Sequence, residues 1–292
     1  MTSQPHHSSK LDLRIVTFVC TIVALVLAGF VAYQYRLLGL DLKSVEGENL
    51  KLTTELTEAE GTISYLLEEN TNQQAIIDNF EGQISSIGST VGTLEKLSQT
   101  DKELLRKYSK VFFLSENYRP AGLAVIDQKY LYQKEDAFAN TEVMSYLEQL
   151  LKAARSDGIE LLIASAFRSF ETQASLKSEY KVIYGAGTAN QFSADQGYSE
   201  HQLGTAMDFT TPAVGGVFSK FQADPAYKWL QNNAHKYGFV LSYPENNAYY
   251  KFEPWHWRFV GVSLATDLHQ DGKYFYDLDQ REIDTYLIKL FD

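Results

Sequence analysis

The sequence predicts an α+β domain with a small antiparallel sheet and helices on one side of it, preceded by a transmembrane helix and a long coiled coil. Three observations support this fold class. An uncharged apolar run fills residues 15–35, and a heptad pattern runs through residues 37–98. After residue 107, strand-like and helix-like segments follow one another without a regular βαβ alternation, which indicates an α+β domain.

The N-terminal segment predicts a membrane anchor. Residues 1–14 are expected to form a polar cytoplasmic tail, in which His6 and His7 are interpreted as an incidental pair rather than as metal ligands. At 1.5 Å per residue, the run at 15–35 spans about 31 Å, which is enough to cross a bilayer core. A cleaved signal peptide is the alternative, although its apolar region is typically only about 7 to 15 residues long. The basic residues on the two sides of the run nearly balance, so charge leaves its orientation open.

The heptad pattern predicts a coiled coil that acts as a spacer. Its seam positions advance by alternating steps of three and four residues from Leu42 to Leu94. Asn49 and Asn70 fall at a positions, where a buried amide favours a parallel dimer and fixes its register. The spacer is therefore expected to join either a second copy of the chain or a partner helix. A long helix folded back on its own domain is the alternative.

The composition favours one globular domain, at 107–292. The three Trp and most of the Tyr and Phe lie in this part of the chain. The formal net charge of −11 argues against nucleic acid as a partner, because phosphate binding needs a basic surface. The single cysteine, Cys20, cannot form an internal disulfide, and it excludes a cysteine-rich structural zinc site.

The elements of this domain are predicted from apolar patterns, caps and turn residues. A hairpin is expected to join two strands through a turn at 127–129, and residues 185–197 are expected to form a loop. The expected strands are 123–126, 130–133, 160–167, 205–209, 239–243, 248–252 and 255–260. The expected helices are 94–108, 141–158, 170–184, 224–237, a helix ending before Gly272, and 279–291.

Two short segments carry the candidate metal ligands and the candidate catalytic base: SEHQLGTAMD at 199–208 and EPWH at 253–256. Catalytic zinc sites keep three nitrogen or oxygen ligands and leave one position for water, and His201, Asp208 and His256 supply three such ligands. Gly204 permits a tight turn, so that the first histidine can lie on a loop before the strand that carries the aspartate.

A catalytic metal site also needs a base that takes a proton from the water. Water on such a metal has its pKa lowered from about 15.7 towards about 7. Glu253 is the candidate base, because it lies three residues before His256. For either histidine taken singly, a hydrogen-bonded, half-buried structural role is the better interpretation, and it is the combination with Asp208 and Glu253 that favours a metal site.

Three separated segments resemble the signature motifs of one family. They read SAFRSFETQ at 165–173, YSEHQLGTAMDF at 198–209 and FEPWHWRFVG at 252–261. Together they are similar to the VanY-type D-alanyl-D-alanine carboxypeptidases, which are zinc enzymes that trim the stem peptides of bacterial peptidoglycan. The resemblance covers roughly residues 118–262 and implies that the domain carries Zn²⁺ on the ligands named above, with Glu253 as the catalytic base.

The resemblance also implies that Arg168 faces the substrate. A planar guanidinium can hold a terminal carboxylate in a bidentate pair and can stabilise an oxyanion. Gln173 and Ser199 are further candidates for contacts with the substrate. A surface salt bridge for Arg168 and a solvent-facing Gln173 are the alternatives. Glu200 receives no role, since either a contact with a ligand or a solvated position would suit it.

The function implied by the resemblance is removal of the terminal D-alanine from stem peptides. Because this substrate lies outside the cell, the chain is expected in the bacterial cell membrane as a single-pass protein, with its catalytic domain outside the cytoplasm. The alternatives are an L,D-carboxypeptidase or an endopeptidase acting on stem peptides, and a non-enzymatic scaffold that binds the wall.

Overall fold

The computed structural model describes residues 10–108, 112–184 and 194–292. The expected pair His6 and His7, and most of the expected loop at 185–197, lie outside the described residues. The chain divides into two compact units, residues 1–87 and 88–292, which are taken separately below.

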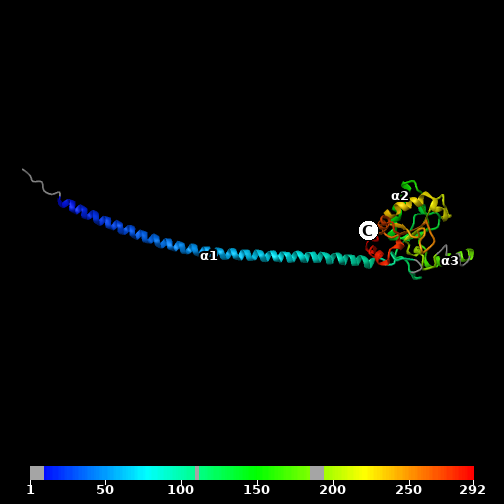
Figure 1. Cartoon of the computed structure of the whole chain (residues 1–292), viewed down its shortest axis with the longest axis horizontal. Coiled ribbons are helices and arrows are strands. Elements are labelled where there is room, and N and C mark those ends of the chain that lie inside the picture. Colours follow the sequence, from blue (N-terminus) through cyan, green and yellow to red (C-terminus); the bar gives the residue numbers. More distant parts are fainter. Residues whose placement is uncertain (1–9, 109–111, 185–193) are drawn as a thin grey trace, which may run out of the picture. The chain divides into compact units, whose positions relative to one another are not determined.

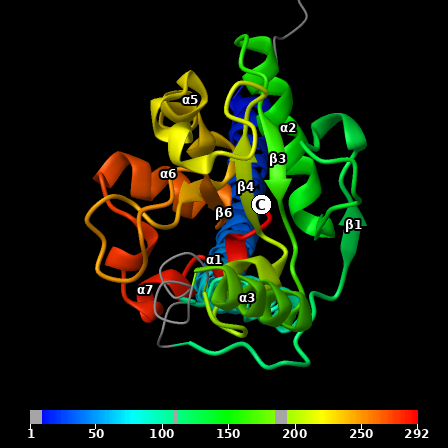
Figure 2. The same cartoon turned by 90° about the vertical axis from the view of Figure 1, so that its right-hand side faces the viewer.

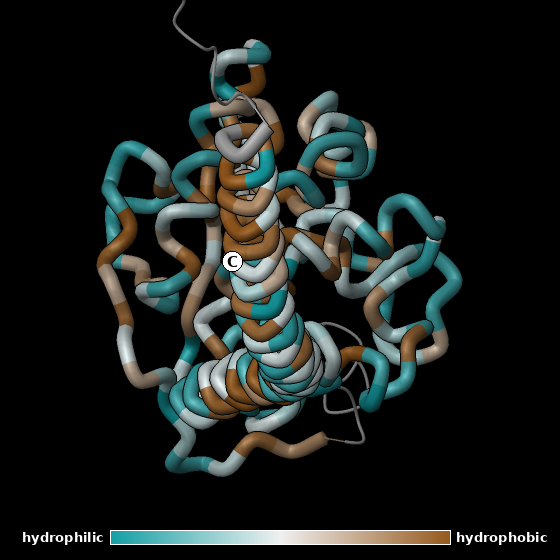
Figure 3. Tube along the Cα trace, turned by 90° about the vertical axis from the view of Figure 1, so that its left-hand side faces the viewer, coloured by the Kyte–Doolittle hydropathy of each residue, from teal (hydrophilic) through white to brown (hydrophobic). Residues whose placement is uncertain are grey.

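One helix, α1 (Lys10–Gln99), occupies the N-terminal third of the sequence (Figure 1). Its apolar run shows as a hydrophobic stretch near the start of the helix (Figure 3). Among the described residues, α1 is the one helix long and apolar enough to cross a membrane, judged by length and composition. The helix is therefore consistent with a membrane anchor.

The expected continuation of helix to residue 108 is wrong, because α1 ends at Gln99. The carboxylate of Asp101 accepts a hydrogen bond from the backbone N–H of Glu103 at 2.9 Å, which stabilises a turn instead of a further helical turn. The turn carries Leu104 and Leu105 into the hydrophobic core, where both are buried.

A four-stranded antiparallel sheet lies at the centre of the second unit. Its strand order is β3 (Leu162–Ser165), β4 (Ala206–Thr210), β6 (His256–Phe259) and β5 (Phe239–Leu241). Every residue of β4 and β6 is buried, so the two central strands are covered on both faces. A separate two-stranded sheet pairs β1 (Leu123–Val125) with β2 (Phe138–Asn140).

Helices flank the larger sheet in the view of Figure 2, with α2 on one side and α5 and α6 on the other. Within its described residues, the domain contains the α-helices α2 (Met144–Ser156), α3 (Phe170–Tyr184), α5 (Pro225–Asn233), α6 (Val262–Asp271) and α7 (Gln280–Asp284). Asp224 caps α5 by accepting from the N–H of Ala226, with proline at the first helical position. The expected mixture of helices with small antiparallel sheets is confirmed, but the expectation of helices on one side only is wrong, because both faces of the two central strands are buried.

Two expected strands are wrong, and side chains that bond to the backbone explain both. Residues 128–130 form a 3-10 helix, because Asp127 accepts from the N–H of Lys129, so β1 pairs with β2 rather than with 130–133. Residues 248–252 form no strand, because the side chain of Asn247 accepts from the N–H groups of both Tyr249 and Tyr250.

Candidate active site

The register of the sheet places the two C-terminal candidate ligands opposite each other. Asp208 on β4 pairs with His256 on β6, and on its other side with Ser165 on β3. His201 lies on a 3-10 helix just before β4, and Gly204 ends that helix with φ +70°. A Cβ atom on Gly204 would lie 3.1 Å from the backbone nitrogen of Asn140, so both backbone conformation and space favour glycine there. The expected tight turn is confirmed.

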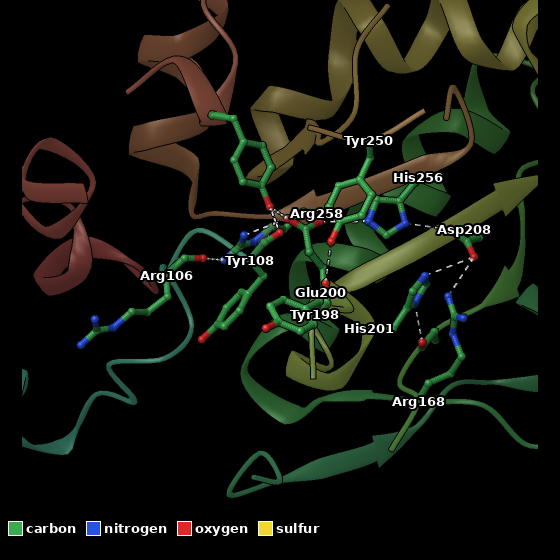
Figure 4. Close-up of polar contacts among 12 residues, drawn as sticks. Arg106, Tyr108, Arg168, Tyr198, Glu200, His201, Asp208, Tyr250, His256 and Arg258 are labelled. Atoms are coloured by element: carbon green, nitrogen blue, oxygen red, sulfur yellow. Dashed lines mark hydrogen bonds and ion pairs between the residues drawn. The ribbon is translucent and has the colours of Figure 1, made fainter. Parts of the chain in front are cut away.

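His201, Asp208 and His256 are buried and converge on one point (Figure 4). Their ligand atoms all lie within 4.8 Å of one another. The Nε2 atom of His201 is 3.2 Å from Asp208 Oδ2, and the Nδ1 atom of His256 is 3.0 Å from Asp208 Oδ1. Three side chains distant in the sequence therefore form a group with the size and chemistry to hold one metal ion.

The remaining nitrogen of each imidazole is held by an acceptor. His201 Nδ1 lies 2.7 Å from the carbonyl oxygen of Ala166, and His256 Nε2 lies 2.9 Å from a carboxylate oxygen of Glu200. Neither oxygen carries a proton to donate, so these nitrogens donate and the opposite nitrogen of each ring faces Asp208. Histidine ligands in metal sites are oriented in this way by carbonyl and carboxylate partners.

The charges in the group suit a cation. Burial and the nearby Arg168 cation lower the pKa of His201 to about 4, so this imidazole is neutral at pH 7. Burial opposes ionisation of Asp208, but the neighbouring histidines hold its pKa well below the ordinary value. For His256, burial works against the proton, but hydrogen bonds to Asp208 and Glu200 raise the pKa to about 10. A metal ion bound here would thus displace a proton from His256.

Glu253 is placed by the turn that leads into β6. Its N–H donates to Tyr243 O at 3.1 Å, and its carbonyl oxygen accepts from the N–H of His256 at 3.1 Å. Burial raises the pKa of the half-buried Glu253 carboxyl to about 7, an effect that the positive charge of His256 partly offsets. The carboxyl can therefore take up and release a proton near neutral pH.

Arg168 follows β3 and points towards Asp208 (Figure 4). Its Nη2 atom lies 3.7 Å from Asp208 Oδ2, and 19% of its side chain is exposed. Its Nε atom has no hydrogen-bond partner among the described residues. A surface salt bridge does not describe this side chain, which brings a cation and a free donor to the edge of the His–Asp–His group.

Gln173 and Ser199 are both buried. Gln173 Oε1 accepts from Arg168 Nη1 at 2.9 Å, and its Nε2 donates to Ala194 O at 2.8 Å. The solvent-facing alternative for Gln173 is therefore wrong, because its amide contacts both the arginine and the carbonyl oxygen of Ala194. Ser199 precedes the helix that carries His201, and its carbonyl oxygen accepts from Gln202 N at 3.2 Å.

Glu200, which received no role from the sequence, is fully buried behind His256. Its Oε1 atom accepts from Arg258 Nη1 at 2.9 Å and from the Tyr276 hydroxyl at 2.6 Å. Burial opposes ionisation, but the Arg258 cation and the His256 hydrogen bond lower the pKa of Glu200 to about 2. The sequence held one signal for this role. Positions 256 and 258 are on the same face of a strand, so a cation at 258 lies beside the candidate ligand at 256 and could pair with an acidic residue near the site, such as Glu200.

Known proteins that are similar to this chain include carboxypeptidases. A family model described as VanY, D-alanyl-D-alanine carboxypeptidase, matches residues 136–262. The putative carboxypeptidase YodJ of Bacillus subtilis (strain 168) is 30% identical over 224 residues, which cover 75% of this chain and 81% of the relative. A D-alanyl-D-alanine carboxypeptidase of Enterococcus faecalis is 32% identical over 142 residues, covering 44% of this chain and 51% of the relative.

Among solved structures, that of the LdcB LD-carboxypeptidase is similar to this chain. The TM-score is 0.52 at 30% sequence identity, and the match covers 56% of this chain and 80% of the other. The likeness thus extends over most of that protein.

Proposed function

Since the chain belongs to the VanY family of D-alanyl-D-alanine carboxypeptidases, we propose that it removes the terminal D-alanine from peptidoglycan stem peptides. The chain is a zinc-dependent carboxypeptidase of this family. The observation that carries the proposal is the convergence of His201, Asp208 and His256, with Glu253 in the backbone turn that leads directly into His256.

The donor set fits zinc. Open catalytic zinc sites use imidazole and carboxylate ligands. Here the imidazole of His201 is neutral, that of His256 can lose its extra proton, and the carboxyl of Asp208 is ionised. His201 Nε2, a carboxylate oxygen of Asp208 and His256 Nδ1 would hold the ion. Bound zinc acidifies a water molecule and polarises the scissile carbonyl group.

The protein supplies the proton transfers and the orientation of the substrate. In this proposal Glu253 takes a proton from the attacking water at a carboxylate oxygen and then gives it to the leaving amine of D-alanine. The reaction adds one water across one peptide bond, so that the shortened peptide and free D-alanine are the products. Arg168 binds the terminal carboxylate of the substrate. Gln173 holds the guanidinium group by accepting a hydrogen bond from Arg168 Nη1, and Ser199 lines the same region.

A mass-spectrometric assay on the full-length protein tests the proposed function. We expect a stem pentapeptide to lose one terminal alanine, a chelator to stop the loss, and added zinc to restore it. The same preparation is given a stem tetrapeptide as the matched substrate. Binding of stems without any product would instead support a wall-binding scaffold and would contradict the hydrolytic function.

The second candidate function is L,D-carboxypeptidase activity. It is favoured by one observation, the 30% identity to a protein whose solved structure is that of an LD-carboxypeptidase. In the assay above, loss of the last residue from the tetrapeptide but not from the pentapeptide would select it. Cleavage inside the stem would point to an endopeptidase.

The N-terminal part of the chain is proposed to hold the enzyme at the bacterial cell membrane. The apolar run at 15–35 would cross the membrane once, residues 37–98 would form a coiled-coil spacer, and the domain at 107–292 would lie outside the cytoplasm, where peptidoglycan is found. Protease added to intact cells should then remove the domain. Protection of the domain until the membrane is broken would contradict this orientation.

A further inference from the structure

The coiled-coil segment of α1 presents an apolar stripe that we call the α1 seam. It consists of the a and d positions between residues 42 and 87. In the structure its large apolar side chains are all exposed: Leu42, Val45, Leu52, Leu56, Ile63, Leu66, Ile77, Phe80, Ile84 and Ile87. A stripe of this length and exposure calls for a second helix packed along it. The charges beside the seam indicate which kind of helix that is.

The positions that flank the seam, e and g, are strongly acidic. Seven acidic residues occupy them between residues 41 and 87: Asp41, Glu46, Glu48, Glu55, Glu60, Glu69 and Glu81. The remaining acidic residues of this stretch, at b, c and f positions, are Glu58, Glu68 and Asp78. Its two basic residues, Lys43 and Lys51, lie at b and c positions, so neither flanks the seam.

This charge pattern disfavours pairing with a second copy of the chain. In a parallel dimer each g position faces the e position five residues later on the other helix. Asp41 would then face Glu46 of the second copy, and Glu55 would face Glu60 of the second copy. Reversing one helix pairs e with e and g with g, and these positions hold acidic residues but no basic residue in this stretch. No alignment of two copies places a basic side chain at a flanking position.

We propose that the α1 seam binds a basic amphipathic helix of another protein. This partner helix has apolar residues at its a and d positions and lysine or arginine at its e and g positions, so that each flanking carboxylate faces a cation. Asn49 and Asn70 set the alignment, because each a-position amide needs a polar side chain opposite it. The ion pair between Lys51 and the flanking Glu55, at 3.7 Å, is exposed and therefore weak, so that a cation of the partner can replace Lys51 there.

Two synthetic helical peptides test the proposal on full-length protein in detergent micelles. Both peptides carry the seam residues of 42–87, one with lysine and the other with glutamate at every e and g position. We expect the lysine peptide to bind at least about tenfold more tightly than the glutamate peptide, with affinity that falls as salt is added. Equal binding of the two peptides, or binding of neither, would overturn the proposal.

Two variants with the same change in net charge distinguish an effect of the e and g positions from an effect of overall charge. The variant Glu48→Lys, Glu60→Lys, Glu69→Lys should lose the preference for the lysine peptide. The control variant Glu58→Lys, Glu68→Lys, Asp78→Lys makes the same change in net charge away from the seam and should keep that preference. Loss of preference in both variants would mean that charge acts without regard to position, which refutes a seam-bound partner.

Self-association is measured directly at the seam. In a Cys20→Ser background, Leu66→Cys places one thiol at a d position, and two copies paired through the seam would form a disulfide under mild oxidation. We expect monomers in this experiment, and efficient cross-linking would overturn the proposal. Release of alanine from stem peptides should be unchanged in every one of these variants, so failure of the proposed enzymatic function would leave the result interpretable.

Discussion

Replacing Glu253 by glutamine is expected to lower kcat by about 10² to 10⁴-fold while zinc stays bound. The amide keeps the shape of the side chain but cannot take a proton from water. The three candidate ligands are left unchanged, and the backbone bonds of the turn, to Tyr243 and His256, do not involve the side chain. Zinc content and the rate of D-alanine release, measured on the same sample, check this prediction.

Glu245→Gln is the matched control, because Glu245 is an exposed carboxylate in the preceding turn. It should retain the wild-type rate. In the wild type, kcat/KM should fall as the pH falls through the pKa of Glu253, since the protonated carboxyl is no longer a base. Burial places that pKa at about 7, and a bound cation would lower it, so the limb lies at or below neutral pH. A Glu253→Gln enzyme with the wild-type rate would remove this residue from the chemistry.

Replacing Arg258 by methionine is expected to cost about 3–5 kcal/mol of folding free energy. The change leaves the buried carboxylate of Glu200 without its cation, and it removes donors to the carbonyl oxygens of Leu104 and Arg106, each at 2.8 Å. For a domain of this size the loss corresponds to a melting temperature lower by roughly 10 °C. Thermal unfolding followed by circular dichroism measures it.

The matched control is Arg119→Met, which breaks an exposed pair with Glu171 at 3.8 Å and should change the melting temperature little. The pH gives a second signature. Since the pKa of Glu200 is lowered in the folded protein, its contribution to stability is present above the ordinary value of 4.5 and is lost as the pH falls towards about 2. Equal melting temperatures for Arg258→Met and wild type would show that this ion pair does not support the fold.

Structural features that depend on a short stretch of sequence could be predicted. The apolar run at 15–35 appears as part of a helix, and Gly204 adopts the positive φ that the expected turn needs. The ligand set could be proposed because His201 and His256 lie in two short segments that also contain carboxylates able to act as a ligand or a base. Their convergence depends on the pairing of β4 with β6, which puts Asp208 opposite His256.

What could not be predicted depends on contacts between distant segments. Glu200 looks like any acidic residue in the sequence, and its burial follows from Arg258 and Tyr276, which lie 58 and 76 residues away. The expected strand at 248–252 has a strand-like composition, but two hydrogen bonds to the side chain of Asn247 turn the backbone. Such competition between side chain and backbone is decided by geometry rather than by propensity.

The binding of one zinc ion by His201, Asp208 and His256 is tested most directly by anomalous diffraction on either side of the zinc absorption edge, from crystals of zinc-supplemented protein. We expect one anomalous peak, about 2.0–2.2 Å from His201 Nε2, a carboxylate oxygen of Asp208 and His256 Nδ1. No peak at this position, or a peak held by other residues, would contradict the metal site and the hydrolytic function built on it.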